Sequence, residues 1–177
     1  FPPNFQNFAH RLRRAGANVL GISDVPYDSL SHELKSNLTE YYKVADMHDQ
    51  DQLVRALGYF THRYGKLHHL DSHNEYWLET EARLRTDFNI PGIQMDRIYN
   101  VKKKSEMKRI FQEAKLNPAR GKVCGTEQEV RDFIKEVGYP VIAKPDNGVG
   151  AAATFKLESD DCIQVYLRGK PNTDYIL

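Results

Sequence analysis

A lysine stands at the end of an apolar run and is followed at once by a loop that contains two glycines. The segment reads Val-Ile-Ala-Lys144-Pro-Asp-Asn-Gly148-Val-Gly150. The apolar run 141–143 and the alternation over 153–157 predict a strand, a loop and a second strand, so the loop forms the tip of a hairpin. The glycines let backbone amides approach phosphate oxygens, and Lys144 adds a mobile positive charge. This pattern favours binding of a nucleoside triphosphate.

The same segment could also be a P-loop or an ordinary hairpin turn. The string Gly-x-x-x-x-Gly-Lys-[Ser/Thr] does not occur in the sequence, and a strand pattern follows the glycines where a P-loop would have a helix. A P-loop is therefore not expected. An ordinary hairpin turn that contains two glycines remains open on local sequence alone, because glycine pairs are common in turns.

The elements ahead of the hairpin alternate between helical and strand patterns. The helices are expected over 4–15, 27–38 and 49–64, and the strands over 18–23, 41–45 and 67–71. Successive helix–strand units predict a parallel sheet with helical crossovers. Ligands bind such sheets beyond the carboxyl ends of the strands, which lie here at 23–24, 46–47 and 72–75. Because a sheet of this kind normally begins with a strand, we expect an initial strand ahead of Phe1 in the parent polypeptide.

The later elements surround the lysine–glycine hairpin. A helix over 75–88 is expected to end at the Pro-Gly pair in 89–92. Thr126 and Glu129 have the spacing of a capping box. Further helices are expected over 103–114, 127–137 and 160–167, and further strands over 119–124 and 174–177.

Composition indicates a globular protein. The 177 residues are 40% hydrophobic, and 25 Lys and Arg against 24 Asp and Glu give a formal charge of +1. This balance gives no electrostatic argument for nucleic acid or a membrane surface, and no apolar run approaches 18 residues. A cytoplasmic location is expected by default. Cys124 and Cys162 lack metal-type spacing and are expected to be structural thiols.

Basic, histidine and acidic residues elsewhere in the sequence are better explained by structural roles than by functional ones. The basic run 102–104, with Lys108 and Arg109 nearby, has no interleaved aromatic platform, so a solvated surface is preferred to a nucleic-acid site. His68, His69 and His73 could hold zinc with Asp71, but residues 68 and 69 point to opposite faces of an expected strand, which argues against such a site. Glu75 follows a strand end and could touch a substrate, but a capping role at the following helix is preferred.

The order of these elements resembles a known family. Lys104 begins a helix in Lys-Ser-Glu-Met-Lys, the segment Ala-Lys-Leu-Asn-Pro118 follows, and the run Gly-Tyr-Pro-Val-Ile-Ala-Lys144-Pro leads through the loop to Gly150 and later to Tyr-Ile-Leu177. This looks like the amino-terminal half of an ATP-grasp domain of the carbamoyl-phosphate synthase and biotin carboxylase type, preceded by a pre-ATP-grasp domain. The glycine loop is sparser than that of biotin carboxylases, which puts direct transfer of their substrate in doubt.

The resemblance implies an α/β fold in two parts. Residues 1–100 would be a Rossmann-like pre-ATP-grasp domain with a parallel sheet, and residues 101–177 the amino-terminal part of an α+β ATP-grasp domain, truncated at the hinge. Lys104 and Lys144 would contact the phosphates. The family pattern further implies a mobile flap over 146–151, with Asp146, Asn147, Gly148 and Gly150 near the nucleotide. It also implies a hinge strand, Tyr175, Ile176 and Leu177, whose backbone binds adenine.

The resemblance also implies an activity. The parent protein would be an ATP-dependent ligase that activates a small carboxylate as an acyl phosphate for attack by an amine or similar nucleophile. Magnesium ligands would lie beyond Leu177, no catalytic residue is assigned, and the segment alone is expected to be inactive. The expected partners are ATP and the carboxylate, without nucleic acid or membrane, and a homodimer is left open. The alternative is a non-catalytic nucleotide-responsive or protein-binding module on the same scaffold.

Overall fold

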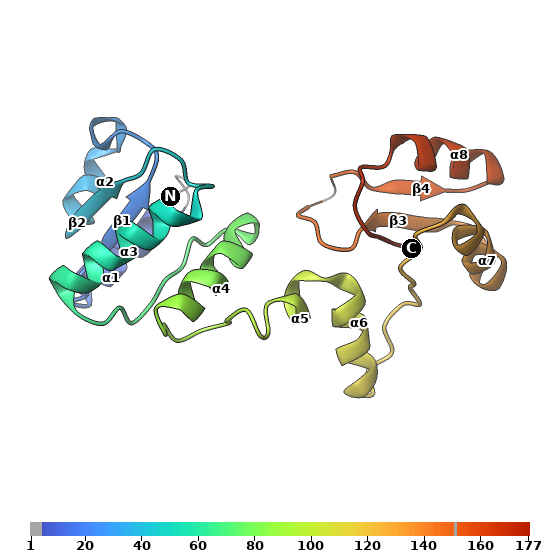
Figure 1. The fold of residues 1–177 in the computed structure, drawn as a ribbon, viewed down its shortest axis with the longest axis horizontal. Helices are drawn as coiled ribbons and strands as arrows, with labels where there is room; N and C mark the ends of the chain where they lie inside the picture. Colours follow the sequence, from blue (N-terminus) through green and yellow to red (C-terminus); the bar gives the residue numbers. More distant parts are fainter. Residues whose placement is uncertain (1–4, 151) are drawn as a thin grey trace. The chain divides into compact units, whose positions relative to one another are not determined.

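The structure, a computed structural model, describes residues 5–150 and 152–177. It divides into two compact units, Phe1–Met95 and Asp96–Leu177 (Figure 1). Each unit has its own cluster of buried apolar side chains. The division lies at residues 95/96, where the sequence had suggested a boundary at residue 100.

The first unit is a small parallel sheet covered by helices. Its strands β1 and β2 run parallel, with Leu20 opposite Glu40 and Ser23 opposite Lys43. The elements of this unit are α1 (Gln6–Arg14), β1 (Leu20–Ser23), η2 (Tyr27–Ser29), α2 (His32–Asn37), β2 (Glu40–Lys43), α3 (Gln50–Tyr64), η3 (Glu75–Trp77) and α4 (Leu78–Asp87). The predicted alternation of helices with β1 and β2 is confirmed.

Helix α3 shows how the sequence specifies these elements. The Asp49 side chain accepts hydrogen bonds from the first free amides of the helix, and Gly65 adopts φ 78° where the helix ends. The apolar residues recur at helical spacing, so they share one face. The buried ones are those that the spacing predicted, namely Leu53, Ala56, Leu57 and Phe60.

The helices of the first unit cover opposite faces of β1. Ala9 of α1 and Leu34 of α2 pack with Val19 on one face. Ile22 instead joins the cluster built on α3 and α4. Successive side chains of a strand point to opposite faces, which explains this partition.

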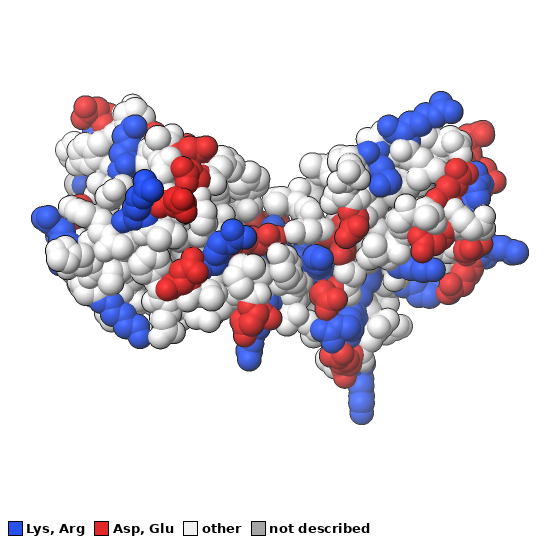
Figure 2. Space-filling model, in the orientation of Figure 1, with Lys and Arg blue, Asp and Glu red and all other residues white. Residues whose placement is uncertain are grey.

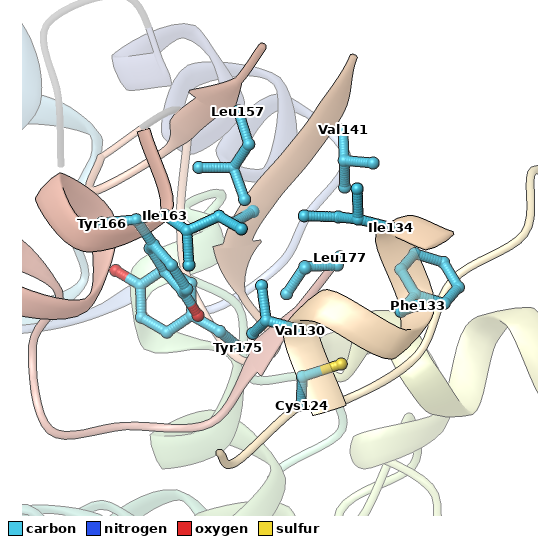
Figure 3. Close-up of a cluster of buried hydrophobic side chains, with 11 residues drawn as sticks. Cys124, Val130, Phe133, Ile134, Val141, Leu157, Ile163, Tyr166, Tyr175 and Leu177 are labelled. Atoms are coloured by element: carbon cyan, nitrogen blue, oxygen red, sulfur yellow. The ribbon is translucent and has the colours of Figure 1, made fainter. Parts of the chain in front are cut away.

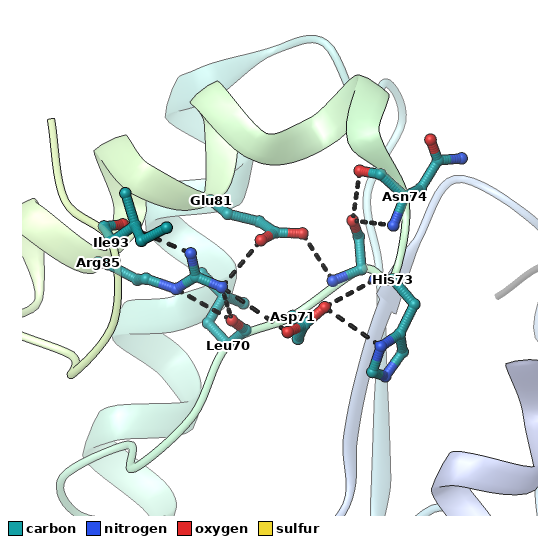
Figure 4. A network of polar contacts seen from close by, with 8 residues as sticks. Leu70, Asp71, His73, Asn74, Glu81, Arg85 and Ile93 are labelled. Atoms are coloured by element: carbon teal, nitrogen blue, oxygen red, sulfur yellow. Dashed lines mark hydrogen bonds and ion pairs between the residues drawn. The ribbon is translucent and has the colours of Figure 1, made fainter. Parts of the chain in front are cut away.

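The expected third strand, 67–71, is not a strand in the structure. A parallel strand exists only through hydrogen bonds to neighbours, and no backbone–backbone hydrogen bond joins 67–71 to another segment described in the structure. Polar side chains hold the segment in place instead (Figure 4): Arg85 donates to the Leu70 carbonyl, and the Ser72 amide donates to Glu81. The sequence prediction was therefore wrong at this position.

The second unit is an antiparallel sheet flanked by helices. Its strands lie in the order β4–β3–β5, with β3 antiparallel to both neighbours. The elements are α5 (Tyr99–Lys102), α6 (Lys104–Glu113), α7 (Glu127–Val137), β3 (Val141–Pro145), β4 (Phe155–Leu157), α8 (Asp160–Gly169) and β5 (Tyr175–Ile176). The strand expected over 119–124 is reduced to an isolated bridge between Val123 and Ile176.

One cluster of buried side chains holds the second unit together (Figure 3). Val130 and Ile134 of α7 pack with Val141 of β3 and with Ile163 and Tyr166 of α8. Burial of each large apolar side chain contributes about 1.5–3 kcal/mol.

Helix α7 of this unit begins with the predicted capping box. The Thr126 side chain accepts from the Glu129 amide, and the Glu129 carboxylate accepts from the Thr126 amide. These reciprocal bonds satisfy two backbone donors that a helix start would otherwise leave free. The prediction of this helix start is confirmed.

Charges of both signs are interspersed over the face seen in Figure 2. Cys124 and Cys162 are free thiols. Within residues 5–150 and 152–177, no helix has the length and apolar character needed to cross a membrane.

Candidate functional site

Strand β3 places Lys144 on the face of its sheet that lies away from the main core. Val141 and Ala143 point into the core, whereas Ile142 and Lys144 alternate with them on the other face. Lys144 lies opposite Ile176 of β5 and is half buried. The predicted strand–loop–strand hairpin is confirmed, because β3 pairs with β4 from Val141 opposite Leu157 onwards.

Lys104, at the start of α6, is directed at the turn that follows Lys144. Its ammonium donates to the carbonyls of Pro145 at 2.8 Å, Asp146 at 3.3 Å and Gly148 at 3.3 Å. Its backbone amide also donates to the Asp146 carbonyl at 3.0 Å. An ammonium has three N–H donors, so these carbonyls engage all of them. Lys104 and the residues after Lys144 are therefore brought together, and contact of Lys104 and Lys144 with phosphate stays a prediction.

These contacts set the direction of the loop amides. A planar trans peptide holds its C=O and N–H on opposite sides. Because the carbonyls of Asp146 and Gly148 point to Lys104, the N–H groups of Asn147 and Val149 point the opposite way. Gly150 has φ 66°, a left-handed conformation that glycine adopts readily. The loop thus presents amides on the side away from Lys104.

Asp146 has a different position from the one expected of a flap residue. It is 3% exposed. Its carboxylate accepts from the Ser105 amide at 2.8 Å and from the Ser105 hydroxyl at 2.7 Å. The side chain therefore caps the first turn of α6 and anchors the base of the loop. Asp146 thus supports the loop from the side of α6.

Lys108 is a residue of the site that the sequence analysis did not select. It lies one turn after Lys104 on α6 and donates to the Ala119 carbonyl. Its pKa is lowered by burial and, next, by the positive charge of Lys144. Neither Lys108 nor Lys144 forms an ion pair with any residue described in the structure. The spacing of four residues between Lys104 and Lys108, one face of a helix, was the signal that could have identified it.

Gly121 makes room for the Lys108 stem. A Cβ at this glycine would lie 2.6 Å from Cε of Lys108 and 3.0 Å from the Leu177 carbonyl oxygen. A side chain at this position would require the end of the Lys108 side chain to move and the Leu177 carbonyl to shift by a few tenths of an ångström, so glycine suits the place where the lysine passes the end of β5. The close packing fixes the lysine stem beside the sheet.

The predicted hinge strand is buried and paired on both sides. Ile176 lies opposite Lys144 of β3, while the Leu177 amide and carbonyl pair with Lys122. The Tyr175 carbonyl accepts from the Cys124 amide. These particular backbone groups are engaged within the chain, and adenine contacts by Tyr175, Ile176 and Leu177 stay a prediction.

A second feature lies in the first unit, at the carboxyl ends of β1 and β2. A cavity of about 280 Å³ is lined by residues from the three expected edge segments, among them Ser23, Asp24, Met47, Ser72 and Asn74. The three segments thus line one cavity, and binding of a ligand at this edge stays a prediction.

Neither Glu75 nor a group of metal ligands contributes to that cavity. The Asn74 side chain, and not that of Glu75, caps the following turn by accepting from the Tyr76 amide. Among the residues that the structure describes, no group of His, Cys, Asp or Glu could hold a metal ion.

The fold is the α/β fold of ATP-grasp ligases, which confirms the resemblance seen in the sequence. An L-amino acid ligase from Bacillus licheniformis superposes with a TM-score of 0.72 and 15% identity, over 96% of this chain and 40% of that one. The biotin carboxylase domain of a 2-oxoglutarate carboxylase from Hydrogenobacter thermophilus, solved with MgADP, ADP and bicarbonate, gives a TM-score of 0.72 and 16% identity over 96% and 40%.

Sequence comparison points the same way. The large chain of carbamoyl phosphate synthase from Neisseria gonorrhoeae is 20% identical over 157 residues, which are 89% of this chain and 14% of that protein. No family model matches the sequence. The chain spans less than half the length of these structures and about a seventh of the curated relative.

Proposed function

We propose that this chain is the phosphate-binding part of an ATP-dependent ligase, which activates a carboxylate as an acyl phosphate for attack by an amine or a similar nucleophile. The observation that carries the proposal is that the Lys104 ammonium donates to the turn after Lys144, while Lys108 of the same helix lies close enough to Lys144 for the two charges to interact. The fold likeness supports the same conclusion. The two units would be the pre-ATP-grasp domain and the amino-terminal part of the ATP-grasp domain.

The electrostatics of Lys108 and Lys144 favour a polyanion. The charge of Lys144 lowers the pKa of Lys108, so the two like charges raise the free energy of the site, and an anion placed between them lowers it. A phosphate chain supplies several negative oxygens in one ligand. The amides of Asn147 and Val149 add hydrogen-bond donors whose orientation is fixed before the ligand arrives.

In this proposal Lys104 positions the loop after Lys144. Its three carbonyl contacts hold the loop in the conformation that turns the amides outward. Direct contact of Lys104 with phosphate would require it to release a carbonyl, and that contact stays a prediction. Asp146 completes the support, because it ties the same turn to α6 through Ser105.

The chemistry that such a site supplies is relief of charge repulsion. An anionic carboxylate approaches the γ-phosphoryl group of a highly charged nucleotide, and ammonium groups with oriented amides stabilise the charge that is redistributed. Magnesium would accompany the nucleotide. The described residues offer it no cluster of ligands, so we assign to this chain only the phosphate contacts.

The proposal is tested with the full-length parent protein. Magnesium-dependent ATP turnover is measured with a panel of small carboxylates, in the wild type and in Lys144→Ala, with Lys135→Ala as a control at an exposed lysine of α7. We expect Lys144→Ala to abolish turnover and Lys135→Ala to leave it unchanged. Nucleotide binding that depends on Lys144 without turnover would instead favour the non-catalytic module, and turnover that survives Lys144→Ala would contradict the proposed site.

A further inference from the structure

The cavity at the carboxyl ends of β1 and β2 has a lining that carries negative charge. Three carboxylate side chains line it, namely those of Asp24, Asp71 and Glu81. Among the described residues that line the cavity, there is neither a lysine nor an arginine. Because carboxylates are ionised near neutral pH, the cavity favours a cation over an anion.

The charge of Glu81 is already balanced within the chain. Its carboxylate accepts from the Ser72 amide at 2.7 Å and from the Arg85 guanidinium at 2.8 Å (Figure 4). The residue is buried, and a buried carboxylate needs a partner of this kind. Glu81 therefore holds the wall of the cavity in place, and the charge that a ligand can use comes from Asp24 and Asp71.

The carboxylates of Asp24 and Asp71 can accept further hydrogen bonds. At Asp71, Oδ1 accepts from the His73 amide at 2.7 Å and lies 3.4 Å from Nδ1 of the same histidine. Its Oδ2 lies 3.9 Å from the Arg85 guanidinium, beyond the range of a hydrogen bond. At Asp24, Oδ1 accepts from the Ser23 hydroxyl at 3.4 Å. A carboxylate has about four lone-pair sites, so both residues keep acceptor capacity for a ligand.

The body of the cavity is apolar. Leu53 of α3 and Leu84 of α4 line it, and both side chains are buried. Trp77 and His48 also line it, with their ring centroids 5.0 Å apart. Aromatic rings pack against apolar groups and attract cations over their faces. The lining therefore suits a positive group that is attached to an apolar body.

The volume of the cavity limits the size of such a ligand. Small-molecule sites in proteins occupy about 300–1,000 Å³. The cavity measures about 280 Å³, at the lower end of this range. It therefore suits a molecule with a short carbon chain.

We propose that this cavity binds a small primary amine in its ammonium form. Asp24 and Asp71 accept hydrogen bonds from the ammonium group, which has three N–H donors, and Leu53, Leu84 and Trp77 surround the carbon chain. An amine is also the class of nucleophile that the proposed ligase uses, so the role of the bound amine as a substrate rests on the proposed function. The binding of the amine does not.

The proposal is tested with three probes of similar shape and different charge. Butylamine is a cation, butanol is neutral and butyrate is an anion. Each is titrated into the 177-residue chain without nucleotide and followed by amide NMR and by the indole N–H signal of Trp77. We expect butylamine to shift the signals of Asp24, Ser72 and Trp77 and to bind about tenfold more tightly than butanol, and we expect no saturable shift from butyrate.

Asp24→Asn and Asp71→Asn test the two acceptors. Asparagine keeps the size of the side chain and a carbonyl oxygen that can accept from the His73 amide, but it lacks the negative charge. Each change should weaken butylamine binding about tenfold and leave butanol binding unchanged. The matched control is Asp28→Asn, at an exposed carboxylate of η2 outside the cavity lining, which should alter neither affinity.

Four results would overturn the proposal. The first is the absence of a saturable shift with butylamine, and the second is an affinity for butanol or butyrate that equals that for butylamine. The third is butylamine binding that survives both Asp24→Asn and Asp71→Asn, and the fourth is an equal loss in Asp28→Asn. No nucleotide takes part, and Lys144→Ala should leave butylamine binding unchanged. A failure of the amine site is therefore observed separately from a failure of the proposed ligase function.

Discussion

Strand β3 and strand β1 hold comparable places in their units but differ in their neighbours. Strand β3 pairs with β4 on one side and with β5 on the other. Within the part of the chain that the structure describes, strand β1 pairs only with β2. Strand β3, which has a neighbour on each side, carries Lys144, and strand β1 borders a groove. A strand with a neighbour on each side can hold a charged side chain in a fixed direction. In the first unit, by contrast, the side chains of Arg85 and Glu81 hold the segment 70–72 in place.

The buried pair of the first unit offers the largest expected effect. Arg85 and Glu81 are 8% and 4% exposed, and their side chains meet at 2.8 Å while both hold 70–72 in place. Arg85→Ala leaves a buried carboxylate without its partner and should lower the free energy of unfolding by about 3–5 kcal/mol. Urea denaturation measures the loss. The control is Arg83→Ala at an exposed position of the same helix, and equal losses in the two variants would contradict the assigned role.

The anchor of the loop in the second unit should show a smaller effect. Asp146→Ala removes both acceptors of Ser105 from a buried position. An unsatisfied amide and hydroxyl should cost about 2–3 kcal/mol, measured by urea denaturation. Asp174→Ala, at an exposed residue that contacts Asp146 only through its backbone carbonyl, should be nearly neutral. A neutral Asp146→Ala would show that the contact does not anchor the loop.

The capping box of α7 should contribute less again. Thr126→Ala deletes the acceptor of the Glu129 amide, and loss of such a cap costs about 1 kcal/mol. The loss should appear in the unfolding midpoint of the second unit. Thr173→Ala, at an exposed loop residue, should not shift that midpoint. A shift of the same size in both variants would argue against the cap.

The smallest predicted effect is a change in the titration of Lys108. Burial and then the charge of Lys144 lower the pKa of Lys108 from its ordinary value of 10.5, so the folded chain releases this proton at a lower pH than the unfolded chain. Stability should therefore rise with pH between the folded pKa and 10.5. Lys144→Gln should raise the pKa of Lys108 and weaken that rise, which side-chain NMR titration can follow. An unchanged Lys108 pKa in Lys144→Gln would show that the two charges do not interact.

The sequence predicted the elements whose signals are local. Glycine and proline around Lys144, the Thr126–Glu129 spacing and the apolar periodicity of α3 each specify structure without help from distant residues. The prediction of a strand at 67–71 was wrong, because a parallel strand depends on partners far away in the chain and not on local signals. The prediction of a strand over 119–124 was wrong for the same reason, because only Val123 forms a bridge there.

The site was predicted in part. Lys104 and Lys144 were selected because both flank strong local signals, and their contact with phosphate stays a prediction. The carboxylate of Asp146 could not be assigned to Ser105 from sequence, since 41 residues separate them. The spacing of Lys104 and Lys108 places both on one face of α6, but the influence of Lys144 on Lys108 joins a helix to a strand and could not be predicted from local sequence.

The most direct test of the account is a titration of the 177-residue chain with ATP, followed by amide and lysine side-chain NMR. We predict weak binding, on the order of 1 mM. The amides of Asn147 and Val149 should shift together with the Lys108 and Lys144 side chains, and Lys144→Ala should abolish all these shifts while Lys135→Ala preserves them. Shifts that persist in Lys144→Ala, or that avoid the loop altogether, would contradict the central claim that these lysines and the glycine hairpin bind a polyphosphate.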